Sequence, residues 1–166
     1  MLDTLTAARS HTEVNGLLSA QRDDRIIEQA ITILEARVFN GGPLLNNMTA
    51  LRDYLRLKLA AEPNEVFITV FLNTANLVLA CETLFTGTIN FTAVHPRVVV
   101  QRALTLNASA LIFVHQHPSG LASPSSGDIK HTTLLKNALA TVDVRVLDHL
   151  IIGKGEPFSF ASSGLL

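Results

Sequence analysis

The first part of the chain carries apolar residues at helical spacing. From Arg22 to Val38 they recur every three or four positions, with acidic residues near the start, which is the pattern of an amphipathic helix. Asn40-Gly41-Gly42-Pro43 interrupts this pattern, and a second helix is predicted from about Thr49. Because Ala61-Glu62-Pro63-Asn64 breaks that helix in turn, we expect residues 1–62 to form an N-terminal helical segment.

Beyond this break the pattern changes from helical to strand-like. Val66 to Leu72 is a nearly continuous run of β-branched and aromatic residues, which predicts a buried strand. A turn over residues 73–76 and a returning strand from Leu77 to Cys81 would complete a hairpin. Pro96 suits the first position of a helix that runs to about Asn107, because its fixed φ and missing N–H cost nothing there.

The last part of the chain alternates between strands and helices. We predict a strand at Ala110 to His115, a helix at Ser126 to Ala140, a strand at Val144 to Ile152 and a short strand near Phe158 to Phe160. This order favours an α/β fold, with a mixed β-sheet flanked by helices, over residues 63–166.

Composition narrows the class of protein. The chain has 166 residues, 48% of them apolar, which suits one compact domain with a short appendage. Its net charge of −1, with Lys and Arg scattered, leaves no electrostatic footprint for nucleic acid. Cys81 is the only cysteine, which excludes an internal disulfide and a cysteine-based zinc site. With no secretory signal and no apolar run long enough for a membrane span, we expect a cytoplasmic protein.

Three residues of metal-binding types lie around one predicted strand end. His115 and His117 are two apart at the end of an apolar strand, so both imidazoles can approach one ion. Asp128 lies in the first turn of the next helix, and the intervening loop can bring it back to that strand end. Two histidines and one carboxylate leave a fourth position for water, as in catalytic zinc sites. The simpler interpretation is two ordinary strand-end histidines and an acid that complements the helix dipole.

A hydrolytic metal site also needs a general base, usually a carboxylate outside the ligand set. Glu65, which opens the clearest strand, and Glu82 are the candidates, although most such glutamates are simply solvated. Ser125 or Ser126 would cap the helix that follows. Ser125 could also donate a hydrogen bond to a developing oxyanion, and the two roles do not exclude each other.

These residues together resemble a known signature. They resemble the JAMM motif of MPN-type metalloproteases. The matching residues are Glu65, His115-x-His117-Pro118 and Ser125-x-x-Asp128, with seven residues between His117 and Ser125. The resemblance implies one zinc ion per chain held by His115, His117 and Asp128. It also implies Glu65 as general acid and base and Ser125 as oxyanion stabiliser.

Further segments narrow the resemblance to bacterial RadC-like proteins, over about Arg22 to Leu166. They are Phe85-x-Gly87-Thr88, Val94-His95-Pro96-Arg97, His117-Pro118-Ser119-Gly120 and Val146-Leu147-Asp148-His149. Val98 and Gln116 depart from the usual Glu and Asn of that family. Neither is an expected ligand, so the departures concern substrate contacts and helix polarity.

The remaining histidines receive no metal role. His131, three residues after Asp128, is either an outer support for the site or a solvated helix residue. His149 either approaches the site from its strand or, as we expect, is a hydrogen-bonded core histidine, and His95 marks the entry to a helix.

We therefore expect a zinc metallopeptidase or isopeptidase that acts on a peptide or protein whose identity the sequence does not indicate. A zinc nucleobase deaminase is disfavoured because its Pro-Cys-x-x-Cys segment needs more than Cys81. The other alternative is a non-catalytic MPN-like binding module, linked to DNA metabolism as the family name suggests. The near-neutral charge does not support strong nonspecific DNA binding.

Overall fold

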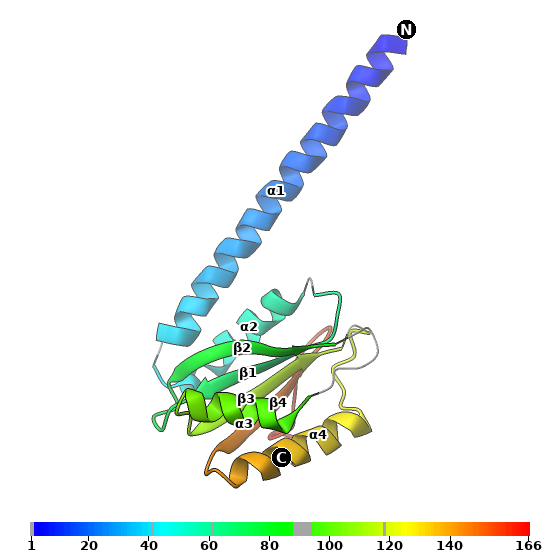
Figure 1. The fold of residues 1–166 in the computed structure, drawn as a ribbon. Coiled ribbons are helices and arrows are strands. Elements are labelled where there is room, and N and C mark those ends of the chain that lie inside the picture. Colours follow the sequence, from blue (N-terminus) through cyan, green and yellow to red (C-terminus); the bar gives the residue numbers. More distant parts are fainter. Residues whose placement is uncertain (1, 41, 61, 88–93, 118) are drawn as a thin grey trace.

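The computed structural model describes residues 2–40, 42–60, 62–87, 94–117 and 119–166 (Figure 1). In chain order its elements are α1 (Leu2–Asn40), the 3-10 helix η1 (Leu44–Asn47), α2 (Met48–Leu59), β1 (Val66–Leu72), β2 (Val78–Thr86), α3 (Pro96–Thr105), β3 (Ala110–Gln116), α4 (Ser126–Ala140), β4 (Arg145–Ile152) and β5 (Phe158–Ser159). Thr88 and Pro118 of the sequence motifs lie outside the described residues.

Within this part of the chain the strands form one mixed sheet, which confirms the predicted fold class. Their order is β2-β1-β3-β4-β5. β3 and β4 run parallel, and the other neighbouring pairs are antiparallel. The α4 helix connects β3 to β4, because a parallel pair needs a crossover rather than a tight turn.

Most predicted elements have the expected bounds, and two are longer. The helix predicted from Arg22 begins at Leu2 and projects away from the sheet (Figure 1). β2 continues past Cys81 because its C-terminal half keeps pairing with β1, as far as Val66↔Thr86. Each helix of the described chain is too short or too polar to cross a lipid bilayer.

A hydrophobic core fills each face of the sheet. On one face Ile68 and Ile112 pack with α2, whose Leu51, Tyr54 and Leu55 are buried there. The other core lies beneath α3 and α4 and contains mainly aromatic and aliphatic residues, among them Phe67, Phe71, Val99, Ala103, Leu111, Phe113, Leu135 and Leu139. The division of the chain at residues 62 and 63 stays a prediction.

The two faces separate because β1 and β3 alternate. Phe67 pairs with His115, and Ile68 pairs with Val114. In an antiparallel pair, directly opposed residues share a face. His115 therefore belongs to the face that α3 and α4 cover, next to the start of α4.

Candidate metal centre

His115, His117 and Asp128 converge at the junction of β3 and α4. The His115 Nε2 atom lies 2.9 Å from His117 Nε2. The Asp128 carboxylate lies 3.2 Å from His115 Nε2 through Oδ1 and 3.4 Å from His117 Nε2 through Oδ2. The predicted trio is thus brought together, and it could hold a metal ion. The roles of its members as ligands stay predictions.

The local sequence explains this convergence. β3 is an apolar strand that is buried along its length, so its end is fixed within the sheet. Beyond it, Gly120 adopts a φ of +78° and donates its N–H to the His117 carbonyl oxygen, which turns the chain back. Ser125 then begins α4 and brings Asp128, in the first turn, opposite the strand end.

The donor atoms suit a small, borderline-soft cation. A tetrahedral zinc ion with bonds of about 2.0–2.2 Å separates its ligand atoms by about 3.3–3.6 Å. The three separations here lie at or a few tenths of an ångström below that range. Two imidazole nitrogens and a carboxylate at such distances need a proton or a cation between them, because their lone pairs repel. The site therefore fits the expected zinc ion.

The electrostatics of the trio agree with this interpretation. Burial disfavours the charged form of Asp128, but the imidazoles of His115 and His117 outweigh it and hold the pKa of the carboxyl well below its usual range. The Asp128 carboxylate in turn raises the pKa of His117. Asp128 therefore stays anionic and attracts either a proton or a metal ion into the gap.

The outer ring nitrogen of His117 is already engaged. His117 Nδ1 lies 3.0 Å from the Leu121 carbonyl oxygen. Because a carbonyl oxygen only accepts, Nδ1 carries the hydrogen and donates it. The inner Nε2 is then free to bind a metal through its lone pair when the ring is neutral.

Glu65 precedes β1 and is half-buried beside this trio. The pairing of β1 with β3 ends at Phe67↔His115, and the same alternation of faces, continued two residues further, would put Glu65 and His117 on the face of His115. Its charge contributes to the raised pKa of His117, which agrees with this placement. Its backbone is anchored, since the Glu65 carbonyl oxygen accepts from the Gly87 N–H at 2.7 Å. The role of Glu65 as general base stays a prediction.

Ser125 is the N-cap of α4, as one of the two sequence interpretations held. Its Oγ accepts from the Asp128 N–H at 3.2 Å, and its own N–H donates to Asp128 Oδ2 at 2.6 Å. This capping box fixes the Asp128 carboxylate while it starts the helix. The Ser125 side chain also hydrogen-bonds to the Asp128 carboxylate and helps to lower its pKa, and the oxyanion role of Ser125 stays a prediction.

Within the described part of the chain, the other candidates do not belong to the group of converging donor atoms. Glu82, on β2, is opposite Thr69 and accepts two hydrogen bonds from Arg102, at 2.7 and 2.6 Å. His95 is the N-cap residue of α3, as expected for a helix entry. Burial is the main cause of the lowered pKa of His149, and charge on His131, which is half-buried on α4, adds to it.

Sequence reasoning missed Thr132 behind the trio and left open whether His149 approaches the site. His149 is buried and hydrogen-bonded, as expected, but its partner at 2.8 Å is His115 itself. Thr132 contacts His149 from α4 at 2.6 Å. The available signal was the spacing of Thr132, four residues after Asp128 and hence on the same helical face.

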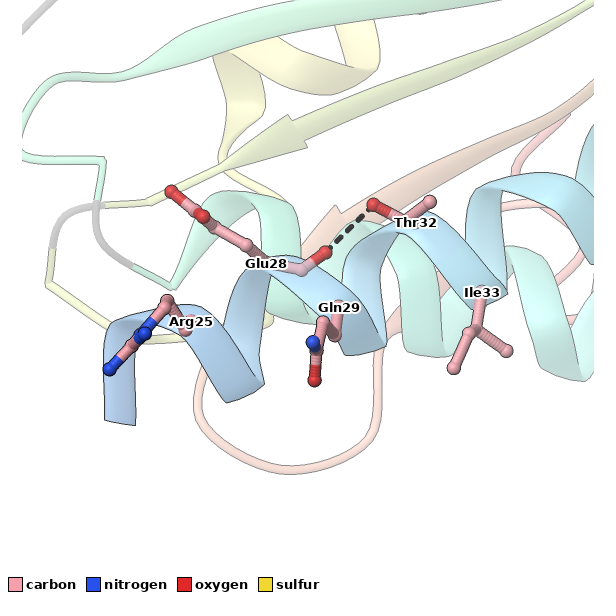
Figure 2. Close-up of a pocket in the computed structure, with 5 residues that line it drawn as sticks. All are labelled: Arg25, Glu28, Gln29, Thr32 and Ile33. Atoms are coloured by element: carbon pink, nitrogen blue, oxygen red, sulfur yellow. Dashed lines mark hydrogen bonds between the residues drawn. The ribbon is translucent and has the colours of Figure 1, made fainter. Parts of the chain in front are cut away.

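A cleft of about 440 Å³ opens beside His117. The end of α2 and the turn after β4 form its walls, and it brings Arg56 and Lys154 near Glu62. A second hollow, on α1, is lined by that helix alone (Figure 2). There the Thr32 hydroxyl donates to the Glu28 carbonyl oxygen at 2.9 Å, an ordinary bond within a helix. Of these two hollows, the cleft is the one that is lined by a residue of the trio.

Sequence comparison with known proteins identifies relatives of this chain. A family model described as a RadC-like JAB domain matches residues 45–165. A UPF0758 protein of Methylibium petroleiphilum is 48% identical over 155 residues, covering 92% of this chain and 69% of that protein. The UPF0758 protein YkfG of Escherichia coli K12 is 46% identical, covering 87% of this chain and 92% of that protein. The chain spans 55% of a UPF0758 protein of Azotobacter vinelandii, with 54% identity.

Proposed function

This chain belongs to the RadC-like JAB domain family, and from that membership and the geometry of its donor trio we propose that it is a zinc-dependent hydrolase of amide or isopeptide bonds. The observation that carries the proposal is the convergence of His115, His117 and Asp128, with the half-buried Glu65 near enough for its charge to raise the pKa of His117. Two histidines and one carboxylate are the ligand type of hydrolytic zinc sites that keep an open position.

The trio would hold the ion, and Glu65 would move the proton. When bound, zinc supplies a Lewis acid for a carbonyl group and makes water easier to deprotonate. The Glu65 carboxylate would take a proton from the attacking water and deliver it to the leaving amine. Its half-buried position at the head of β1, facing the His117 side of the trio, suits both transfers.

The Ser125 hydroxyl would stabilise the oxyanion. Its oxygen accepts the Asp128 N–H, and its hydrogen would turn from the Asp128 carboxylate toward charge that develops on the substrate. Because the capping box holds Ser125 at the start of α4, the donor is oriented before the substrate arrives.

The cleft beside His117 supports a peptide or protein as the substrate. It offers both cationic and anionic side chains, Lys154 and Glu62 among them. Such mixed charge suits a polypeptide better than the polyanionic backbone of a nucleic acid.

The test is a comparison of Glu65→Gln with wild type. The variant should keep about one zinc per chain, measured by inductively coupled plasma mass spectrometry after dialysis, because Glu65 lies outside the ligand set. Hydrolysis of a panel of fluorogenic peptides and isopeptides should fall by at least about 100-fold, the contribution typical of a general base.

Glu82→Gln is the matched control, because it makes the same change at a glutamate bonded to Arg102. It should retain activity. Full activity in Glu65→Gln would contradict its role. Well-folded wild-type protein that takes up no zinc, even after zinc is added back, would exclude the hydrolase and leave the non-catalytic binding module.

A further inference from the structure

We propose that His149 and Thr132 are positioning residues that hold His115 in the one tautomer able to bind the metal. Both residues lie behind the trio, on β4 and α4. The inference rests on the proposed metal site, but it does not depend on hydrolysis. It concerns which nitrogen of His115 carries a hydrogen before any ion arrives.

The direction of the hydrogen bonds is set at one backbone carbonyl group. The Thr132 hydroxyl lies 2.6 Å from the Asp128 carbonyl oxygen, which can only accept. Thr132 therefore donates its single hydrogen there. Its oxygen also lies 2.6 Å from His149 Nδ1, so the hydrogen between these two atoms must belong to His149 Nδ1.

The tautomer of His149 then dictates that of His115. A neutral imidazole carries one hydrogen, so His149 Nε2 presents a lone pair. It lies 2.8 Å from His115 Nδ1, which must therefore be the donor. The hydrogen of His115 is then on Nδ1, and its Nε2 presents a lone pair toward His117 and Asp128.

The opposite direction would disable the site. If Thr132 donated to His149, the hydrogen of His149 would move to Nε2 and be donated to His115 Nδ1. The hydrogen of His115 would then be on Nε2, where it would point at His117 and Asp128 and prevent this nitrogen from binding a metal ion. The Asp128 carbonyl oxygen selects against this arrangement because it would lose its bond to Thr132.

Burial strengthens the preference for one tautomer of His149 and of His115. Thr132 and His149 are each 1% exposed and His115 is 2% exposed. Phe67, Phe113 and Phe160 all make ring contacts with His149. Because water has little access, a hydrogen bond lost inside this group is not replaced by solvent, and each ring keeps its orientation.

This series of hydrogen bonds begins and ends at the same predicted ligand, Asp128. It starts at the Asp128 carbonyl, passes through Thr132 and His149 to His115, and ends opposite the Asp128 carboxylate. A ligand from β3 and a ligand from α4 are thereby held in one arrangement. This is the orienting role that partners of metal-bound histidines commonly have.

Zinc affinity of the full chain provides the first test, by competition with a chromophoric chelator. Thr132→Val keeps the shape of the side chain and removes the hydroxyl, and we expect its Kd for zinc to rise about tenfold. His149→Phe removes both nitrogens in an aromatic surrounding, and we expect a rise toward about 100-fold. Thr132→Ser restores the hydroxyl and should restore the affinity.

Thr133→Val is the matched control. Thr133 is exposed on the same helix, and its hydroxyl makes the same kind of bond, to the Ile129 carbonyl oxygen at 2.9 Å. Removing it should leave the Kd for zinc unchanged, so a loss confined to Thr132→Val is not a general effect on α4.

The second test observes the tautomers directly in metal-free protein. Long-range proton–nitrogen correlation spectra of histidine labelled with nitrogen-15 distinguish the two ring forms, with single-histidine substitutions for assignment. We expect the Nδ1–H form at both His115 and His149 in wild type. In Thr132→Val the Nε2–H form should become populated, which a merely structural threonine would not cause.

Two results would overturn the inference: an Nε2–H form at His115 or His149 in wild type, or wild-type zinc affinity in both Thr132→Val and His149→Phe. Wild type that binds no zinc would remove both this inference and the proposed function. Zinc binding without hydrolysis of any tested bond would contradict the hydrolase alone and leave the positioning role intact.

Discussion

Gly153 sits where the loop between β3 and α4 meets the end of β4. A Cβ added there would lie 2.6 Å from the Gly120 carbonyl oxygen and 2.7 Å from the Ala122 N atom. Both are backbone atoms, so neither can rotate away. Leu121, between them, supplies the carbonyl oxygen that orients His117. Glycine at this position therefore permits the close packing on which one metal ligand depends.

Gly153→Ala should move this loop. We expect a loss of about 1–3 kcal/mol in the free energy of unfolding, typical of forced overpacking, and a weaker zinc affinity because the Leu121 carbonyl shifts from His117. Chemical denaturation and chelator competition measure the two effects. Gly155→Ala is the control: a Cβ there meets open space but the φ is +100°, so it should cost stability without changing zinc affinity. Wild-type stability and affinity in Gly153→Ala would refute this account.

Among the elements, the pairing of strands brings the site together. The β1–β3 register pairs Phe67, two residues after Glu65, with His115, although the two segments are far apart in the chain. A register shift between β3 and β4, after Leu111↔Val146, leaves Leu147 unpaired. The bulge puts Val146 and His149 on the same face, where simple alternation would have turned His149 away from His115.

The pairing of β2 with α3 gives a pH-dependent prediction. Hydrogen bonds from Arg102 lower the pKa of Glu82. A carboxyl whose pKa is lowered by folding stabilises the fold above its unfolded pKa, about 4.3, and loses that contribution as pH falls through the folded value. Glu82→Gln should therefore lower the free energy of unfolding at pH 7, and the difference from wild type should shrink below about pH 4.

Urea unfolding at a series of pH values measures this difference. Glu156→Gln serves as the control, because Glu156 is 86% exposed and lies 3.7 Å from Arg56, and such surface pairs contribute little. A difference for Glu82→Gln that is the same at pH 3 and pH 7 would show that the ion pair with Arg102 is not the cause.

Across the whole molecule, the metal site joins two layers. His115 comes from the sheet, and Asp128 comes from the helix that covers it. The same layers share the core around Phe113 and Leu135. A bound ion would therefore act as a cross-link between the sheet and α4, and its free energy of binding would stabilise the folded chain.

Zinc removal should consequently lower the melting temperature. At free zinc about 1,000-fold above its Kd the stabilisation is about 4 kcal/mol, which corresponds to a shift of about 8–16 °C for a chain of this size. Differential scanning calorimetry with zinc and with excess chelator measures it. His117→Ala should show a much smaller response, since one donor is missing. Identical melting of wild type with and without zinc would argue against a structural link through the ion.

Much of this molecule could be predicted from local pattern. The apolar run Val66–Leu72 and the helix Ser126–Ala140 have the bounds that their residues indicated. The trio His115, His117 and Asp128 was identified as a set because its members are close in the chain. Such features depend on periodicity, capping and donor chemistry, which neighbouring residues determine among themselves.

The support behind the trio could not be predicted in this way. His149 is 34 residues from His115 in the chain, and it reaches that side chain only because β4 pairs with β3 through a bulge at Leu147. The hydrogen-bond direction that leaves a lone pair on His115 Nε2 for a metal ion also requires Thr132. Registers and buried hydrogen-bond networks arise from contacts between distant segments, so they exist only once the chain has packed.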